Sequence, residues 1–170
     1  ITFLLGNNTS VGSIEGNNTG GIQLGGPGND YAEWLPRLDA RETIVPGDIV
    51  GIVGGRVTRD TREASQVMVV STGPIVSGND PGEAARGGFA QVAFIGQALV
   101  KVRGPVQAGD FIVPSGLDDG TGMAIAPESV SAEQLAQVVG EAWEAATGAE
   151  VKNVRTAVGF IRNDVALRRV

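Results

Sequence analysis

Glycine interrupts this chain so often that long helices have little room to form. The 170 residues include 26 glycines and 8 prolines, which favour turns between short strands. Residues 49–53 are an apolar run between a Pro-Gly-Asp turn and a Gly-Gly turn, and further strand patterns occupy residues 66–72, 88–104 and 154–160. We therefore predict a mainly β fold of one domain, with a small appendage at the amino terminus.

Two segments of the β region resemble each other. The sequence "VPGDIVGIVGGRVT" begins at Val45, and "QAGDFIVPSGLDDGTGMAIAP" begins at Gln107. Each has Gly-Asp at a turn, followed by an apolar strand, a glycine turn and a second strand. We expect Asp48 and Asp110 to accept backbone N–H bonds at these turns. Two copies of one hairpin indicate a pseudo-symmetric small barrel or a β-clip-like sheet.

One amphipathic helix is expected over residues 131–146. Ser131 and Gln134 have the spacing of a capping box, and Gly148 supplies a stop. The apolar face of this helix would consist of Leu135, Val138, Val139, Ala142, Trp143 and Ala146. Trp143 is therefore predicted to lie in the core, where its replacement by Ala would cost roughly 3–5 kcal/mol.

The chain opens on a polar repeat. Gly-Asn-Asn-Thr occurs at residues 6–9 and again at 16–19, and Leu4, Ile14 and Leu24 recur at the same ten-residue interval. One apolar residue per repeat is too little to offset the entropy lost on ordering, unless copies of the chain stack on one another. We predict that residues 1–28 are the end of a shaft held together by other copies, and that 29–170 form a head. A flexible Gly/Asn linker is the alternative.

Composition excludes several classes of protein. The chain has no Cys and no His, so disulfides, the usual zinc, haem and iron–sulfur sites, and a Ser–His or Cys–His pair within one chain are ruled out. The net charge of −6 comes without a basic patch, so we expect no nucleic-acid binding. No apolar run is long enough for a membrane helix. Asp118-Asp119-Gly120 lacks the alternating ligands of a calcium loop and is read as a hairpin turn. We expect no metal and no cofactor.

The segment after residue 28 carries a recognisable motif. "GNDYAEWLPRLD" contains Asp30, Tyr31, Ala32, Glu33 and Trp34. It resembles the opening of the C-terminal intramolecular chaperone domains of phage tail fibres and neck appendages, in particular the autoproteolytic peptidase G2 type. "SVGSI", at residues 10–14, is similar to the segment that often ends the fibre shaft before such a domain. The resemblance covers roughly residues 10–160.

The resemblance implies a homotrimer on a virion or an extracellular, cell-surface appendage. Three chains would wind together in the shaft, where Leu4, Ile14 and Leu24 meet their equivalents, and the head would register and cap them. Some members of the family then cut themselves away, using a hydroxyl residue at the junction. Here Asn29 precedes Asp30, so we assign no catalytic residue and expect an uncleaved chain. If cleavage does occur, Asp30 and Glu33 are the candidate acids.

Three hypotheses of function follow. The first is a structural and assembly domain at the end of a trimeric fibre. The second is an enzyme limited to one self-directed turnover. The third is a fibre tip that binds a receptor or glycan through residues 71–88, which are rich in Gly, Pro and Asp and are expected to form an exposed loop.

Overall fold

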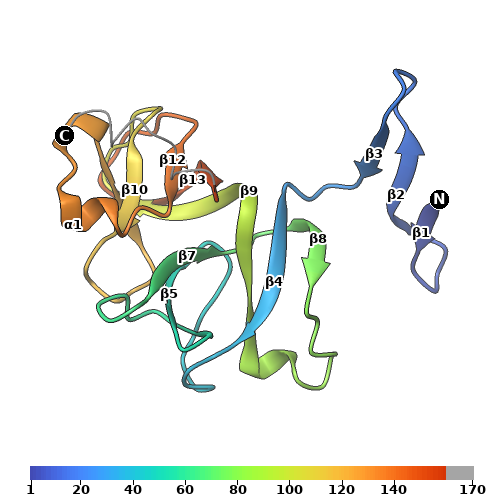
Figure 1. Ribbon diagram of the computed structural model, residues 1–170, viewed down its shortest axis with the longest axis horizontal. Helices are drawn as coiled ribbons and strands as arrows, with labels where there is room; N and C mark the ends of the chain where they lie inside the picture. Colours follow the sequence, from blue (N-terminus) through green and yellow to red (C-terminus); the bar gives the residue numbers. More distant parts are fainter. Residues whose placement is uncertain (160–170) are drawn as a thin grey trace.

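A computed structural model describes residues 1–159 of the chain (Figure 1). The strands in chain order are β1 (Thr2–Leu4), β2 (Ser10–Gly16), β3 (Ile22–Gly25), β4 (Asp30–Pro36), β5 (Ile49–Val53), β6 (Arg56–Thr58), β7 (Gln66–Val70), β8 (Pro74–Gly78), β9 (Phe89–Arg103), β10 (Phe111–Pro114), β11 (Gly122–Ile125), β12 (Gly140–Ala142) and β13 (Val151–Val158). The helical segments are η1 (Arg86–Gly88), η2 (Pro127–Ser129) and α1 (Ala132–Leu135). Strands make up 48% of the structure and helical segments 6%, which confirms the predicted mainly β fold.

The carboxy-terminal half of the body is a closed five-stranded barrel. Its strands follow the order β11–β10–β12–β13–β9, and a parallel pairing between β9 and β11 closes the ring. Alternate residues point into the barrel and form its core. Val100, Val102, Ile112 and Val154 are completely buried there. The prediction of a small barrel is therefore confirmed.

A second core lies against the first half of β9, among β5, β6 and β7. Neighbouring residues of one strand enter different cores because side chains alternate between the two faces of a sheet. Val69 and Ala93 face each other across β7 and β9 in the barrel core, whereas Val70 and Val92, one residue away on each strand, pack in the second core. Burial on both faces explains why these strands read as continuous apolar runs.

The two repeated turns have the same local geometry. Asp48 Oδ2 accepts the backbone N–H of Val45 at 3.0 Å, and Asp110 Oδ2 accepts that of Gln107 at 2.8 Å. In each turn the glycine before the aspartate has a positive φ, 84° and 95° respectively. Asp48 is also buried and accepts a bond from Lys101 Nζ at 2.7 Å. The predicted structural role of both carboxylates is confirmed.

The prediction of a long helix over residues 131–146 is wrong. The capping box exists, with reciprocal bonds between Ser131 and Gln134, but α1 ends after four residues. The chain then enters β12, which pairs with β10 and β13. Gly140 is required in this strand, since a Cβ there would lie 2.3 Å from Thr156 Cγ2.

The predicted core position of Trp143 is also wrong. Its side chain follows β12 and is 52% exposed. Val139 and Ala142, from the same expected helix face, do pack in the barrel core. They reach it from an extended chain, in which Trp143 points to the other side.

Residues 1–25 form a separate three-stranded antiparallel sheet, β1–β2–β3, which projects from the body beyond the segment that joins them (Figure 1). The repeated Gly-Asn-Asn-Thr motifs are its turns. In both motifs the first Asn side chain accepts the backbone N–H of the Thr two residues later at 3.1 Å. The second Asn has a positive φ, 64° at Asn8 and 60° at Asn18. The ten-residue period is therefore the length of one strand with its turn.

Substitutions of Ile112 in the barrel core and of the exposed Trp143 test whether residues 140–142 are a strand of the barrel. Ile112→Ala should lower the free energy of unfolding by about 2–5 kcal/mol, because it leaves a cavity in the barrel core. Trp143→Ala should lower it by less than about 1 kcal/mol, because half of that side chain is already in solvent. Urea unfolding of both variants measures the difference. A larger loss for Trp143→Ala than for Ile112→Ala would contradict this description of the barrel.

Candidate functional site

One face of the amino-terminal sheet is apolar. Ile1 and Ile14 exchange backbone bonds of 2.8 and 2.7 Å, and Ile14 lies opposite Leu24 across β2 and β3. Residues directly opposite each other in antiparallel strands share a face, so these three side chains form a row. Phe3 and Ile22 are two residues from Ile1 and Leu24 and lie on the same side. We call these five residues the amino-terminal apolar face.

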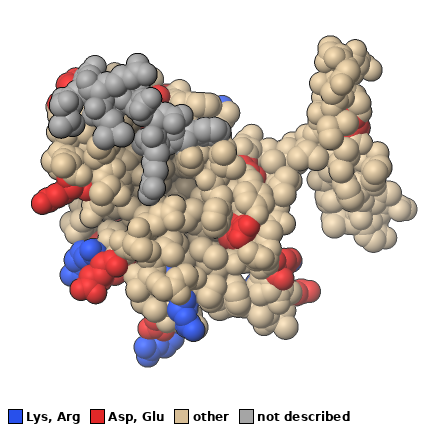
Figure 2. Space-filling model, viewed as in Figure 1, with Lys and Arg blue, Asp and Glu red and all other residues tan. Residues whose placement is uncertain are grey.

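No other part of the described chain covers this face. Ile1 and Ile22 are each 80% exposed, and Phe3 and Leu24 about half exposed. The whole sheet has few charges, as Figure 2 shows: Glu15 is the one charged side chain in residues 1–25. Contiguous apolar surface of this kind marks a contact site in soluble proteins.

The opposite face of the same sheet is mostly polar. It contains Thr2, Ser13, Glu15 and Gln23, with Leu4 and Val11 as apolar exceptions. The sheet is therefore amphipathic, although it has no second layer of its own to pack against. A small sheet gains independent stability only when such a face is packed.

The predicted shaft residues are only partly brought together. Ile14 and Leu24 are cross-strand neighbours in the row. Leu4 instead lies opposite Ser10, beyond a β-bulge, and Ile1 occupies the place beside Ile14. The ten-residue spacing did not reveal Ile1, Phe3 and Ile22; the alternation within the short strands is the signal that identifies them.

The junction between sheet and body is fixed by backbone contacts. Asn29 donates its N–H to Gly73 O at 3.1 Å and accepts a bond from Gln97 N at 3.2 Å. Gly28 lies so close to β8 that a Cβ there would be 2.3 Å from the carbonyl carbon of Pro74. The amino-terminal sheet is therefore attached to the body at a defined place.

Asp30, the first residue of the Asp-Tyr-Ala-Glu motif, is buried at this junction. It is 2% exposed, and its Oδ1 accepts a bond from Ser71 Oγ at 3.0 Å. Its Oδ2 has no hydrogen-bond partner in the described part of the chain. Burial raises the pKa of Asp30, against the opposing effect of the Ser71 bond. Gly96 lies opposite, where a Cβ would come within 2.6 Å of Asn29 O.

Tyr31 and Glu33 lie on the other face of β4. The Tyr31 hydroxyl donates to Glu33 Oε1, and Asn79 Nδ2 donates to Glu33 Oε2 at 2.6 Å. The bond to Glu33 raises the pKa of Tyr31. Because Asp30 points to the opposite side, the two candidate acids do not converge on one peptide bond.

Residues 71–88 are mostly exposed, as the sequence predicts, but they are not a continuous loop. Strand β8 runs parallel to β4 in the middle of this segment, and η1 ends it. Arg86 forms an ion pair with Asp80, and its guanidinium lies 5.5 Å above the Trp34 ring. Trp34 is therefore covered on one face by the segment that was expected to bind a receptor or glycan.

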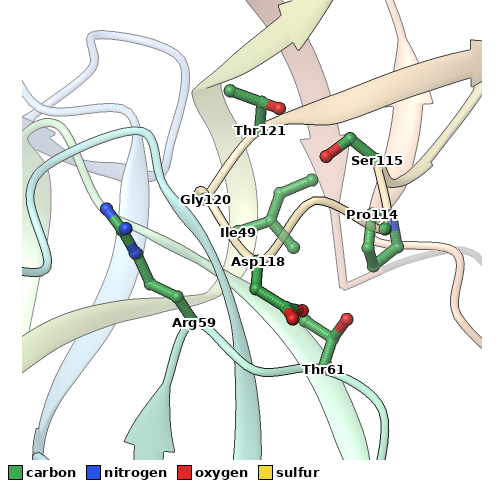
Figure 3. A pocket seen from close by; sticks show the side chains of 9 residues that line it. Ile49, Arg59, Thr61, Pro114, Ser115, Asp118, Gly120 and Thr121 are labelled. Atoms are coloured by element: carbon green, nitrogen blue, oxygen red, sulfur yellow. The ribbon is translucent and has the colours of Figure 1, made fainter.

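A small hollow lies where the turn between β10 and β11 meets Arg59 and Thr61 (Figure 3). Its volume of about 10 Å³ is at the lower limit for holding one water molecule. In this turn Asp119 accepts the backbone N–H of Thr121 at 2.9 Å and an Arg103 bond at 3.1 Å. Residues 1–159 contain no cluster of acidic side chains that could hold a metal ion.

Comparisons with protein families, with curated proteins and with solved structures gave no match. Within residues 1–159, no helix has the length and apolar character needed to cross a membrane. The function of this protein is therefore inferred from the chain's own surfaces.

The burial of Asp30 predicts a particular pH dependence. Because its pKa is raised in the folded state, its contribution to stability is full below the unfolded value of 3.8 and is lost as pH rises through the folded pKa. Asp30→Asn removes this loss while keeping the shape of the side chain. As pH rises from about 4 to 8, the free energy of unfolding of the wild-type protein should fall relative to that of the Asp30→Asn variant. Parallel pH curves would contradict the buried position of the carboxyl group.

The separation of Asp30 and Glu33 predicts that the chain stays intact. Each carboxylate is held by its own partners, on opposite faces of β4. Intact-mass measurement after days at room temperature should show one species of 17.4 kDa. A pair of fragments from a break between residues 25 and 31 would show that the junction cleaves itself.

Proposed function

We propose that this protein is an assembly domain of a homotrimeric fibre or surface appendage. Residues 1–28 form part of the contact between copies, and the body registers and caps the three chains. The observation that supports the proposal is the amino-terminal apolar face, which lies at the end of a fixed junction and is covered by no other described residue.

The energy available from this face is substantial. Full burial of a large apolar side chain stabilises a protein by about 1.5–3 kcal/mol. Five such side chains in each copy therefore offset a sizeable part of the entropy lost when a short sheet is ordered. A partner that presents the same apolar face satisfies every copy equally, and closed symmetry ends the assembly at a fixed number.

Three copies are proposed because the Asp30–Trp34 motif resembles trimeric phage fibre and neck-appendage domains. Two copies would also cover each other's faces, as a two-layer sandwich, so the number requires direct measurement. On this proposal the protein acts on a virion or an extracellular appendage. The arrangement of Asp30 and Glu33 favours the structural role over self-cleavage.

Mass in solution tests the proposal. The wild-type chain should have three times the mass of the 17.4 kDa protomer by light scattering at micromolar concentration. Combined Ile14→Asp and Leu24→Asp substitutions should give a monomer, because burying carboxylates in an apolar contact is costly. The body should stay folded, since its two cores lie elsewhere.

A control uses the polar face of the same sheet. Thr2→Asp places a carboxylate between Ile1 and Phe3 in sequence but on the polar face, opposite the uncharged Ser13, so it should remain trimeric. A monomeric wild-type protein, or equal dissociation by the control, would overturn the proposed contact.

A further inference from the structure

A chain of hydrogen bonds at the junction ends on one buried carboxyl group. Ser71 Oγ donates to Asp30 Oδ1 at 3.0 Å and accepts the backbone N–H of Gly73 at 3.2 Å. Gly73 O in turn accepts the N–H of Asn29 at 3.1 Å. The carboxyl group of Asp30 is therefore bonded, through Ser71 and Gly73, to the segment that joins the amino-terminal sheet to the body. We call these four residues the junction network.

The carboxyl group of Asp30 has no partner that would balance a negative charge. Its Oδ2 atom is buried without a hydrogen-bond partner among residues 1–159. The segments beside it are residues 26–29, 71–75 and 94–98, and none of their side chains titrates. Glu33, on the same strand, bonds to its own partners on the opposite face of β4. An ionised carboxylate in such a place costs free energy that a neutral carboxyl group does not.

The ionised group can reach water without unfolding the body. Asp30 is the first residue of β4, and Ser71 and Gly73 lie between β7 and β8. The two hydrophobic cores include none of these residues. Separation of residues 26–30 from residues 71–75 would therefore expose the carboxylate and leave both cores packed. Because residues 26–29 connect the amino-terminal sheet to β4, the same separation would release the sheet.

We propose that the junction network is a pH-sensitive latch, which is closed while Asp30 is neutral and opens locally when Asp30 is ionised. In the open state the amino-terminal sheet turns freely relative to the body, and the body stays folded. Every residue of the latch belongs to one chain, so the latch operates in a monomer as it does in a trimer.

The direction of the pH effect follows from the two states of the latch. In the closed state burial raises the pKa of Asp30, against the effect of the Ser71 bond, whereas in the open state the carboxyl group is in water and has its ordinary pKa of 3.8. The equilibrium constant for opening is therefore smallest below pH 3.8. It increases as pH rises towards the pKa of the closed state, and it is constant above that pKa.

Amide hydrogen exchange provides the first test. Asn29 donates its N–H to Gly73 and Gln97 donates to Asn29, both at the junction, whereas Val139 donates to Ile112 O in the barrel. At pH 8 the opening constants of Asn29 and Gln97 should exceed that of Val139 by about tenfold or more. Urea below the unfolding transition should accelerate exchange of Val139 alone, because local opening exposes little surface.

The Asp30→Asn variant tests whether ionisation drives the opening. After correction for the pH dependence of intrinsic exchange, the opening constant of Asn29 in the wild-type protein should rise about threefold or more between pH 4 and pH 8. In Asp30→Asn it should stay constant, because the amide does not titrate.

Ser71→Ala and its neighbour Thr72→Ala form a matched pair that leaves Asp30 in place. The Ser71 bond lowers the pKa of Asp30, so its removal should extend the rise in opening to a higher pH. Thr72 is exposed, and Thr72→Ala should keep the wild-type curve. A merely structural role of Ser71 would increase opening by the same factor at every pH.

Three results would overturn the latch. The first is exchange of Asn29 and Gln97 that responds to urea as Val139 does, since the junction would then open only when the body unfolds. The second is the same pH curve for the wild-type protein and Asp30→Asn, and the third is the same curve for Ser71→Ala and Thr72→Ala. None of these results depends on the mass in solution, so failure of the latch and failure of the proposed trimer are distinguishable.

Discussion

Strand β9 joins the two halves of the body, and Gly96 marks the point where it passes from one to the other. Residues before Gly96 pair with β4 and β7, and those after it pair with β13. Its φ of 128° is one that side chains rarely adopt. The space beside it is filled by the backbone of Asn29 and Asp30. A residue without a side chain is therefore required where β9 passes between the two halves and where the segment after the amino-terminal sheet packs against it.

The sequence predicted best where structure is decided locally. The hairpin at residues 49–58 and the paired roles of Asp48 and Asp110 follow from turn chemistry within a few residues. The predicted helix over residues 131–146 is wrong although its apolar spacing is helical, because pairing with β10 and β13 holds residues 140–142 in an extended strand. The requirement for Gly140 comes from Thr156, which lies on another strand. Sequence periodicity does not contain that information.

The candidate surfaces were predicted only in part for the same reason. Ile14 and Leu24 are related by a sequence repeat, whereas the inclusion of Ile1 depends on strand register. Asp30 belongs to a visible motif, but its partner Ser71 is 41 residues away. Motifs identified important places in the chain, and tertiary pairing decided what each side chain contacts.

The position of the junction has a mechanical consequence. The chain enters the body along β4, which is flanked by a parallel strand on one side and an antiparallel strand on the other. Tension applied at the amino terminus therefore acts along β4 and shears both rows of hydrogen bonds together. Rows loaded in this way resist as a group, whereas a peeled strand loses its bonds one at a time. The body is thus attached through the geometry that best withstands a pull from the amino-terminal side.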